Sequence, residues 1–181
     1  MVRDHVGEDD AEQALFDQEM TELFRDHHLG LFRFLRSLGV ERNCAEEIVN
    51  DAFLVVCRQW AVVRRLDKPS AYLFKVARIR WSNIGPRRAR QLYELGGARP
   101  LEVRVDDPCD GVIEEEAMLE LLSHLSQRYR EVLLLRDVYG FGNREVADIL
   151  KLDEGTVKRY RSNARERLRK LLEETSGRQG R

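Results

Sequence analysis

The 181-residue sequence has little cysteine and no long hydrophobic run. Its three cysteines, Cys44, Cys57 and Cys109, are odd in number and form no Cys-x-x-Cys pair, which argues against a disulfide framework or a self-contained zinc site. No run of about 18 apolar residues occurs, and the acidic start is unlike a signal peptide. We therefore expect a cytoplasmic protein with reduced cysteines, no metal or other cofactor, and no direct insertion into a membrane.

The sequence also lacks the common arrangements of catalytic residues. It contains no phosphate-binding glycine loop, no paired-carboxylate site and no histidine and cysteine arrangement typical of a nucleophile. The histidines are scattered, and the adjacent pair His27 and His28 would point about 100° apart on a helix, which is unsuited to sharing a metal ion. We therefore do not expect an enzyme.

The net charge of −1 conceals a strong segregation of charge along the chain. Residues 1–22 hold one base and eight acids, whereas residues 23–90 hold fourteen bases and six acids. Residues 91–120 hold two bases and nine acids, and residues 121–181 hold fourteen bases and nine acids. Two basic modules thus alternate with two acidic segments, and basic modules suit a polyanionic partner.

The segment 143–170 has the apolar spacing of two helices joined by a tight turn. The residues expected to face inward are Val146, Ala147 and Leu150 in the first helix, Leu152 in the turn, and Val157, Tyr160, Ala164 and Leu168 in the second helix. The second helix would begin at Thr156. This pattern predicts a helix-turn-helix.

The opposite face of the second helix is basic. Between residues 155 and 170 there are seven Lys or Arg residues and one acid, and a helix of about 23 Å fits the major groove of DNA. The stripe consists of Lys158, Ser162, Arg165 and Arg169, flanked by Arg159 and Arg161. A solvated charged face is the alternative, but the preceding helix and turn favour DNA binding.

The earlier basic module is also predicted to be helical. Apolar residues recur at helical spacing from Met20 to Leu38, and Gly39 can end that helix. Asn43 and Glu46 have the spacing of a capping box for a helix over 44–60. Pro69 fits the first turn of a further helix.

That further helix, residues 70–83, interleaves aromatic and basic residues. Leu73, Val76 and Ala77 are expected to face inward, while Tyr72 and Trp81 are either stacking platforms for unpaired DNA or ordinary core residues. Gly85 and Pro86 are expected to end or kink the helix.

We predict an all-α protein with two small helical domains joined by an acidic flexible linker, the second domain being a four-helix helix-turn-helix unit. The expected segments are an acidic, frayed tail (1–19), a first domain (20–90), a linker rich in Gly and Pro (91–112), a second domain (113–172) and a C-terminal tail (173–181).

Several motifs, taken in order, resemble the extracytoplasmic-function group of bacterial sigma-70-type sigma factors. They are AEEIVNDAF (45–53), Trp60, YLFKVAR (72–78) and the long segment 122–160 that ends in GTVKRY. The resemblance implies a factor that binds the largest and second-largest subunits of core RNA polymerase, recognises the minus-35 and minus-10 promoter elements, and promotes DNA melting. It also implies an anti-sigma factor as a partner.

The resemblance assigns roles to three sets of residues. Core polymerase would be contacted by Glu47, Asp51 and Phe53. The minus-10 strand would be bound by Arg64, Arg65, Lys68, Tyr72, Lys75, Arg78, Arg80, Trp81, Asn83, Arg87 and Arg88. The minus-35 duplex would be bound by Thr156, Lys158, Arg159, Arg161, Ser162 and Arg165.

The sequence departs from the family pattern at a few positions. Ser126 replaces a usual proline, Gly142 a usual serine cap, and Ile79 a usual asparagine. Lys151 stands where glycine is common, at a cost of about 1 kcal/mol if its backbone is left-handed. A stand-alone helix-turn-helix regulator is the alternative function, but it leaves the first module unexplained.

Overall fold

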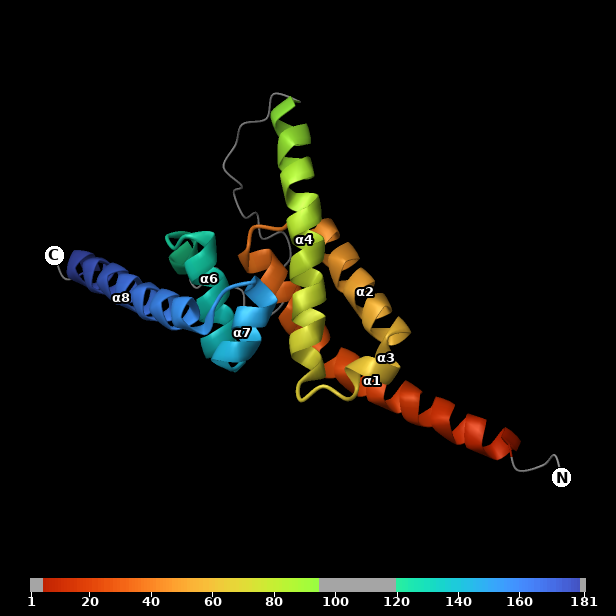
Figure 1. The fold of residues 1–181 in the computed structure, drawn as a ribbon. Helices are drawn as coiled ribbons and strands as arrows, with labels where there is room; N and C mark the ends of the chain where they lie inside the picture. The colour runs from red at the N-terminus through yellow and green to blue at the C-terminus, as the bar shows by residue number, and fades with distance from the viewer. Residues whose placement is uncertain (1–4, 95–119, 180–181) are drawn as a thin grey trace.

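The computed structural model describes residues 5–94 and 120–179, with side chains described for 10–84 and 120–174. Its elements are α1 (His5–Ser37), α2 (Arg42–Arg58), α3 (Trp60–Val63), α4 (Pro69–Glu94), α6 (Gln127–Leu133), the π-helix η1 (Leu134–Val138), α7 (Asn143–Leu150) and α8 (Glu154–Gln179) (Figure 1). Residues 120–123 are also helical. No strand occurs within the described ranges, and the all-α prediction is confirmed.

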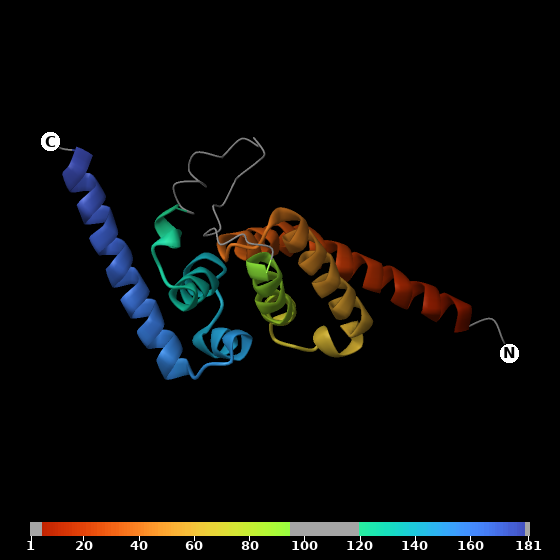
Figure 2. The ribbon, with the colours of Figure 1, turned by 90° about the horizontal axis from the view of Figure 1, so that it is seen from above.

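The elements α1 to α4, here called the N-terminal group, share one apolar core. Each long helix contributes fully buried side chains, among them Phe34 in α1, Ile48 in α2 and Leu73 in α4. Gly39, with φ 84°, ends α1 as its position in the sequence predicted. The helices α2 and α4 pack side by side against the C-terminal half of α1, and the apolar side chains of the first part of α4, up to Ile84, join this core (Figure 2).

Residues 5–19 do not form the frayed tail expected from their acidity. They are the beginning of α1, which starts at His5. Side chains one turn apart are joined, with Gln13 Nε2 2.9 Å from Asp17 Oδ1, and Glu19 reaches the side chains of Trp60 and Arg64. Local hydrogen bonds and the anchor at Glu19 thus support a helix despite the excess of acids.

Two predicted helix ends also differ in the structure. The helix α2 starts at Arg42 with Glu41 as N-cap and no side-chain cap, so the Asn43 and Glu46 capping box is not formed. Glu46 is instead bonded to Arg42, with Nε and Oε1 3.2 Å apart. Gly85 and Pro86 were predicted to end or kink the helix, and they do not end α4, which continues to Glu94.

The elements α6, η1, α7 and α8, here called the C-terminal group, form the predicted helix-turn-helix. The helix expected over 129–139 is α6 followed by η1, where the Tyr139 N–H donates to the Leu134 carbonyl five residues earlier, at 2.9 Å. Val146, Leu150, Val157 and Ala164 are buried as predicted. Residues 91–94 of the predicted linker (91–112) belong to α4, while residues 95–119, which contain the rest of it and the start of the predicted second domain, lie outside the described residues.

The turn between α7 and α8 is built by two residues. Lys151 at the C-cap of α7 has φ 55° and ψ 52°, the left-handed conformation for which the sequence predicted a cost. Asp153 then caps α8, its Oδ1 accepting the Thr156 N–H at 2.7 Å. The recognition helix therefore begins at Glu154, two residues before the predicted start.

The two groups pack directly against each other along α4 and α7 (Figures 1 and 2). Phe74 of α4 is 1% exposed, and its ring lies 4.9 Å from that of Tyr139 and 5.1 Å from that of Phe141. Tyr139 OH also donates to the Gly30 carbonyl of α1 at 2.8 Å. Aromatic packing therefore joins the two groups into one apolar core.

Candidate nucleic-acid interface

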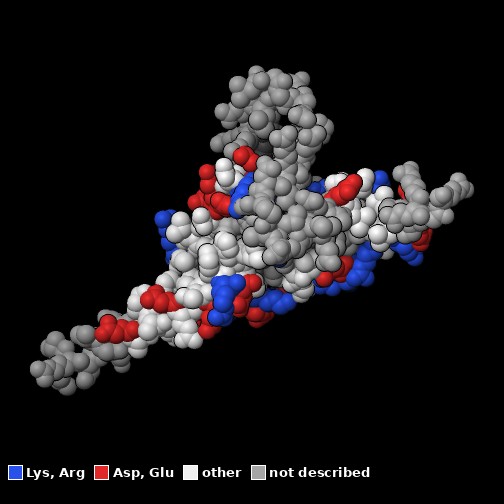
Figure 3. Space-filling model, turned by 180° about the vertical axis from the view of Figure 1, so that it is seen from behind, with Lys and Arg blue, Asp and Glu red and all other residues white. Residues whose placement is uncertain are grey.

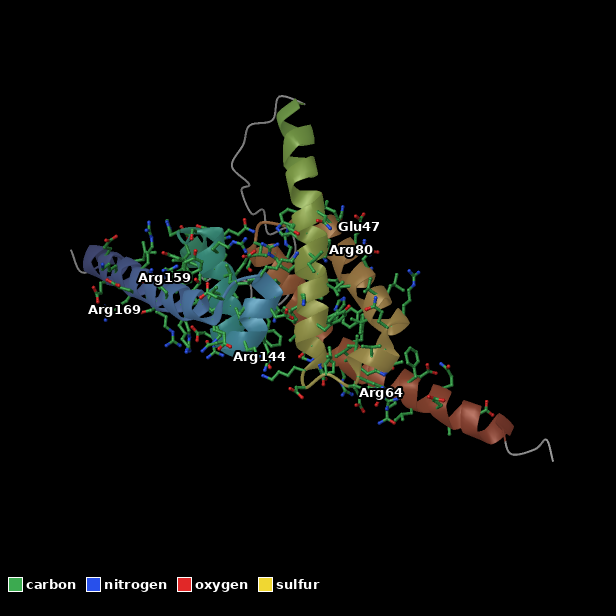
Figure 4. All side chains as sticks on the ribbon, viewed as in Figure 1. Glu47, Arg64, Arg80, Arg144, Arg159 and Arg169 are labelled. Atoms are coloured by element: carbon green, nitrogen blue, oxygen red, sulfur yellow. The ribbon has the colours of Figure 1, made fainter. Side chains whose placement is uncertain are left out.

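The outer face of α8 carries exposed basic and polar side chains over a buried apolar face. Val157 and Ala164 are fully buried, and Tyr160 stacks edge-on against Tyr129 with ring centres 5.3 Å apart. Lys158, Arg159 and Ser162 are exposed. In Figure 4, Arg159 and Arg169 lie along the length of α8. The structure thus presents these three predicted duplex-contacting side chains to solvent, and a fourth, Arg165, is also 56% exposed.

The other predicted duplex contacts already have protein partners. Asp137 of η1 accepts hydrogen bonds from Arg161 and from Arg165, with Nε to Oδ distances of 2.9 and 3.0 Å. Thr156 Oγ1 donates to Asp153 Oδ2 at 2.6 Å. These three residues hold the start and the inner edge of α8 in place, and they present less free charge than Lys158 and Arg159.

The charged form of the Asp137 carboxylate is stabilised by Arg161 and Arg165. Partial burial acts to raise its pKa, but the hydrogen bonds and positive charges of Arg161 and Arg165 together hold the pKa below the usual value for aspartate. Its side chain is 19% exposed, and it stays ionised at neutral pH. Asp137 therefore fixes α8 against η1 by charge-assisted hydrogen bonds.

The predicted minus-10 residues lie along α4 and the segment before it. Arg65, Lys68, Arg80 and Asn83 are exposed, and Arg64 donates to Glu19 Oε1 at 3.0 Å. Arg64 and Arg80 lie towards opposite ends of the N-terminal group (Figure 4). Arg87 and Arg88 belong to the backbone of α4, but their side chains lie outside those described.

The two aromatic residues for which the sequence left two interpretations are half-buried. Tyr72 and Trp81 pack partly against the core while keeping an exposed edge. Tyr72 OH donates to Gln59 Oε1 at 2.6 Å. Both rings thus have a packed face and an accessible edge, which is compatible with stacking on a base.

Three basic residues of this set contact acids of the C-terminal group. Lys75 Nζ lies 2.7 Å from Asp148 Oδ2, and Lys68 Nζ lies 3.2 Å from Glu145 Oε2. Arg78 Nε lies 2.8 Å from Oε1 of Glu131. The structure therefore brings both predicted DNA-binding modules together through the basic side of α4. Figure 3, which views the molecule from behind, shows acidic and basic side chains interspersed on that face.

The predicted polymerase-contacting residues separate into exposed and buried members. Glu47 and Asp51 project from α2, and Asp51 Oδ2 lies 4.0 Å from Arg80 Nη1. Phe53 is only 7% exposed and packs on Phe24. Leu54, which the sequence analysis did not select, is 53% exposed. The acidic outer edge of α2 is thus available, whereas Phe53 belongs to the core in this conformation.

Several residues of the site were missed from sequence, namely Phe74, Glu131, Asp137, Glu145 and Asp148. The one signal was Glu131, an acid at the start of an apolar run that contributes to the core. It is fully buried and bonded to Gln127, Arg128 and Arg78. A buried carboxylate requires such partners, so an arginine contact could have been expected there, but not which arginine.

The described helices include none that is long and apolar enough to cross a membrane. Among the described residues there is also no group of His, Cys, Asp and Glu side chains suited to a metal ion.

Comparison with known sequences agrees with this architecture. A sequence model of sigma-70 region 4 matches residues 115–168, which contain α6, α7 and most of the basic part of α8. The match identifies residues 115–168 as a sigma-70 region 4 domain.

More complete matches extend over both groups. The chain is 27% identical over 158 residues to the RNA polymerase sigma-E factor of Streptomyces avermitilis, covering 86% of each chain. It is 24% identical to the ECF RNA polymerase sigma factor SigM of Bacillus subtilis, covering 83% of this chain and 93% of the relative. The chain is therefore similar, over most of its length, to sigma factors that include one of the extracytoplasmic-function group.

Solved structures show the same fold. The sigma factor RpoE of Bartonella quintana, determined in complex with the anti-sigma factor NepR, matches with a TM-score of 0.73 and 25% identity over 87% of this chain and 96% of that chain. CnrH, determined with the cytosolic domain of CnrY, matches with a TM-score of 0.56 and 22% identity over 87% of this chain and 89% of that chain.

Proposed function

We propose that this protein is an RNA polymerase sigma factor that binds core polymerase, recognises the minus-35 and minus-10 promoter elements, and promotes DNA melting. The observation that carries the proposal is the pairing of a basic helix-turn-helix with a second group whose long helix α4 is lined by basic and aromatic side chains. One group would bind duplex DNA and the other an unpaired strand, and a promoter-opening factor needs both.

The predicted duplex-contacting residues of α8 fall into two sets, according to whether their side chains are hydrogen-bonded within the protein. The exposed Lys158, Arg159 and Ser162 would contact the minus-35 duplex, while Thr156, Arg161 and Arg165 would position α8. Phosphate contacts from such side chains supply affinity, and contacts with base edges supply specificity. This assignment narrows the larger set of residues implied by the sequence.

On α4, the strand would be held by phosphate contacts from Lys68, Lys75, Arg78 and Arg80, with Tyr72 and Trp81 available to stack on bases. A melted strand bound in this way cannot re-pair with its complement. The free energy of strand binding therefore favours the open promoter, and no catalytic group is required. We propose that the chain itself is not an enzyme.

Core polymerase would dock on the outer edge of α2, through Glu47 and Asp51. Opposite charges across such an interface set register and association rate. The relatives of known structure were determined with anti-sigma factors, and we propose that a comparable partner regulates this chain in the cytoplasm.

The docking surface can be tested with Asp51→Arg. We expect loss of binding to core polymerase with an unchanged circular dichroism spectrum, because Asp51 is exposed on α2. Asp26→Arg, at an exposed position on α1, is the matched control and should bind core polymerase normally. Equal affinity of both variants for core polymerase would contradict the assignment.

A stand-alone helix-turn-helix regulator would need only the C-terminal group. It would leave the exposed acids of α2 and the basic face of α4 without a role. Binding to core polymerase distinguishes the two functions.

A further inference from the structure

We infer that Glu19 is a positioning residue for the strand-binding surface, because its carboxylate fixes α3 and the residues that follow α3 towards α4. The inference rests on the proposed function and gives a role to the acidic first part of α1. Residues 10–22 hold five acids and no base, a charge that opposes DNA binding by that part itself. Glu19 acts on the strand through α3 and does not contact it.

The carboxylate of Glu19 divides its two oxygens between two residues that lie one helical turn apart. Oε2 accepts the Trp60 Nε1 hydrogen bond at 2.8 Å, and Oε1 accepts one from Arg64 Nη2 at 3.0 Å. Trp60 is the first residue of α3 and Arg64 is its C-cap, and Arg64 lies where α1 passes α3 (Figure 4). One side chain of α1 thus holds both ends of α3.

The helix α3 is too short to hold its own place. It has four residues, whereas an isolated helix shorter than about 12–15 residues is at best marginally stable in water. Trp60 and Val63 are buried, but Val62 is 69% exposed. The position of α3 is therefore set by two buried side chains and by the bonds to Glu19.

The orientation of α3 determines where two predicted strand contacts lie. The Arg65 N–H donates to the Val62 carbonyl at 3.2 Å, so the turn of α3 continues into Arg65, whose side chain is exposed. Gln59, the residue before α3, accepts the Tyr72 hydroxyl hydrogen bond at 2.6 Å. A phosphate-contacting cation and a base-stacking ring thus both depend on α3.

The pairing with Glu19 also changes the role of Arg64. The resemblance placed Arg64 among the strand contacts, but its charge is offset by Glu19 at a side chain that is 36% exposed. Arg64 therefore supports the strand-binding surface, and Arg65 and Lys68, which are exposed, contact the strand.

Loss of Glu19 has two effects of opposite sign on strand binding. It removes a negative charge from the neighbourhood of the strand, which favours binding, and it releases α3, which weakens binding. Charges that interact through water are screened over about 8 Å at physiological ionic strength, whereas hydrogen bonds to charged groups are the stronger kind. The release of α3 is therefore the larger effect.

Three variants of the full chain separate these effects. Glu19→Ala removes both bonds to α3. Glu22→Ala makes the same charge change on α1, at an exposed residue that is bonded to Gln18, and is the matched control. Glu19→Gln keeps an oxygen for Trp60 but cannot form the ion pair with Arg64.

The test measures binding of each variant to a labelled oligodeoxythymidine by fluorescence anisotropy at several salt concentrations. We expect Glu19→Ala to bind about fivefold more weakly than wild type, because the fraction of chains with α3 in place falls to about one-fifth. The slope of log K against log salt concentration should fall in magnitude by about 0.7, because one phosphate contact is lost. Glu22→Ala should bind at least as tightly as wild type, and Glu19→Gln should lie between wild type and Glu19→Ala.

A general loss of stability would leave the salt slope unchanged, because the chains that remain folded would bind through all their contacts. Hydrogen exchange of the backbone amides of residues 64–66, without DNA, supplies the second readout. It should be faster in Glu19→Ala than in wild type and Glu22→Ala.

Two results would overturn the inference. One is hydrogen exchange at residues 64–66 that is the same in Glu19→Ala and in wild type. The other is an affinity and salt slope of Glu19→Ala that equal those of Glu22→Ala. A wild-type chain that does not bind the oligonucleotide would instead contradict strand binding itself, which belongs to the proposed function, even where hydrogen exchange shows that Glu19 fixes α3.

Discussion

Asp137 and Arg165 are joined by two parallel hydrogen bonds, from Nε to Oδ2 at 3.0 Å and from Nη2 to Oδ1 at 2.7 Å. Arg161 Nε donates to the same carboxylate at 2.9 Å. One acid in the π-helix therefore pairs with two arginines of α8 and offsets one of their two positive charges. The basic stripe seen in the sequence is thus divided into arginines that hold α8 against η1 and exposed residues, Lys158, Arg159 and Ser162, that we propose contact DNA.

This division predicts different effects for alanine substitutions at Arg165 and at Lys158. Arg165→Ala should lower the melting temperature, because Asp137 then loses one of its two partners. Lys158→Ala should leave the melting temperature unchanged but weaken duplex binding. The slope of log K for duplex binding against log salt concentration should fall in magnitude by about 0.9, because one phosphate contact is lost. Calorimetry and salt-dependent binding to a minus-35 duplex would check both. A larger loss of stability in Lys158→Ala than in Arg165→Ala would contradict the division.

The lowered pKa of Asp137 predicts that the free energy of unfolding falls as the pH is lowered through the acid range. A carboxyl group whose pKa is lower in the folded state stabilises the fold above its unfolded pKa, and that contribution is lost as pH falls through the folded pKa. Its loss is therefore expected below the usual aspartate pKa of about 3.9. Asp137→Asn should show a smaller loss of stability over that acid range than wild type. Identical acid unfolding curves for the two proteins would refute this.

The left-handed conformation of Lys151 predicts a stabilising substitution. Lys151→Gly removes the steric conflict of a side chain at φ 55° and should raise the free energy of unfolding by about 1 kcal/mol. Lys151→Ala is the matched control, because it removes the long side chain while keeping Cβ. Chemical denaturation would measure both. Equal stabilisation by glycine and alanine would show that side-chain length, rather than backbone strain, matters.

The hydroxyl group of Tyr139 predicts a modest coupling between the two groups. Tyr139→Phe keeps the ring against Phe74 but removes the hydrogen bond to the Gly30 carbonyl, at a cost of about 1 kcal/mol. Tyr160→Phe removes a hydroxyl group within the C-terminal group and serves as control. Hydrogen exchange of the α1 amides near Gly30 should increase only in Tyr139→Phe. Unchanged exchange there would mean that the bond does not couple the groups.

Local patterns were sufficient to predict most helices and the buried sides of α7 and α8. The apolar stripes of 143–170 depend on residues a few positions apart, and they specify which side of α7 and α8 is buried. Residues 5–19 were predicted wrongly because their acidic composition was taken to indicate a frayed tail. The contacts of Glu19 with Trp60 and Arg64 could not be predicted, because those residues are distant in sequence.

Contacts between the groups could not be predicted in the same way. Lys68 and Glu145 are 77 residues apart, and Lys75 and Asp148 are 73 apart. No periodicity links residues at such separations, because their approach depends on how two folded units dock. Sequence therefore predicted the cations of α4 but not the carboxylates that occupy them, and Phe74 was not recognised as the contact between the units.

Promoter-specific initiation by the purified chain with core RNA polymerase is the most direct measurement. The substrate is a promoter library, and the control is core polymerase alone. We expect new transcripts starting downstream of a shared pair of upstream motifs, with fewer such transcripts when Lys158 and Arg159 are both changed to alanine. Absence of a specific transcript from any promoter, together with absence of binding to core polymerase, would contradict the account.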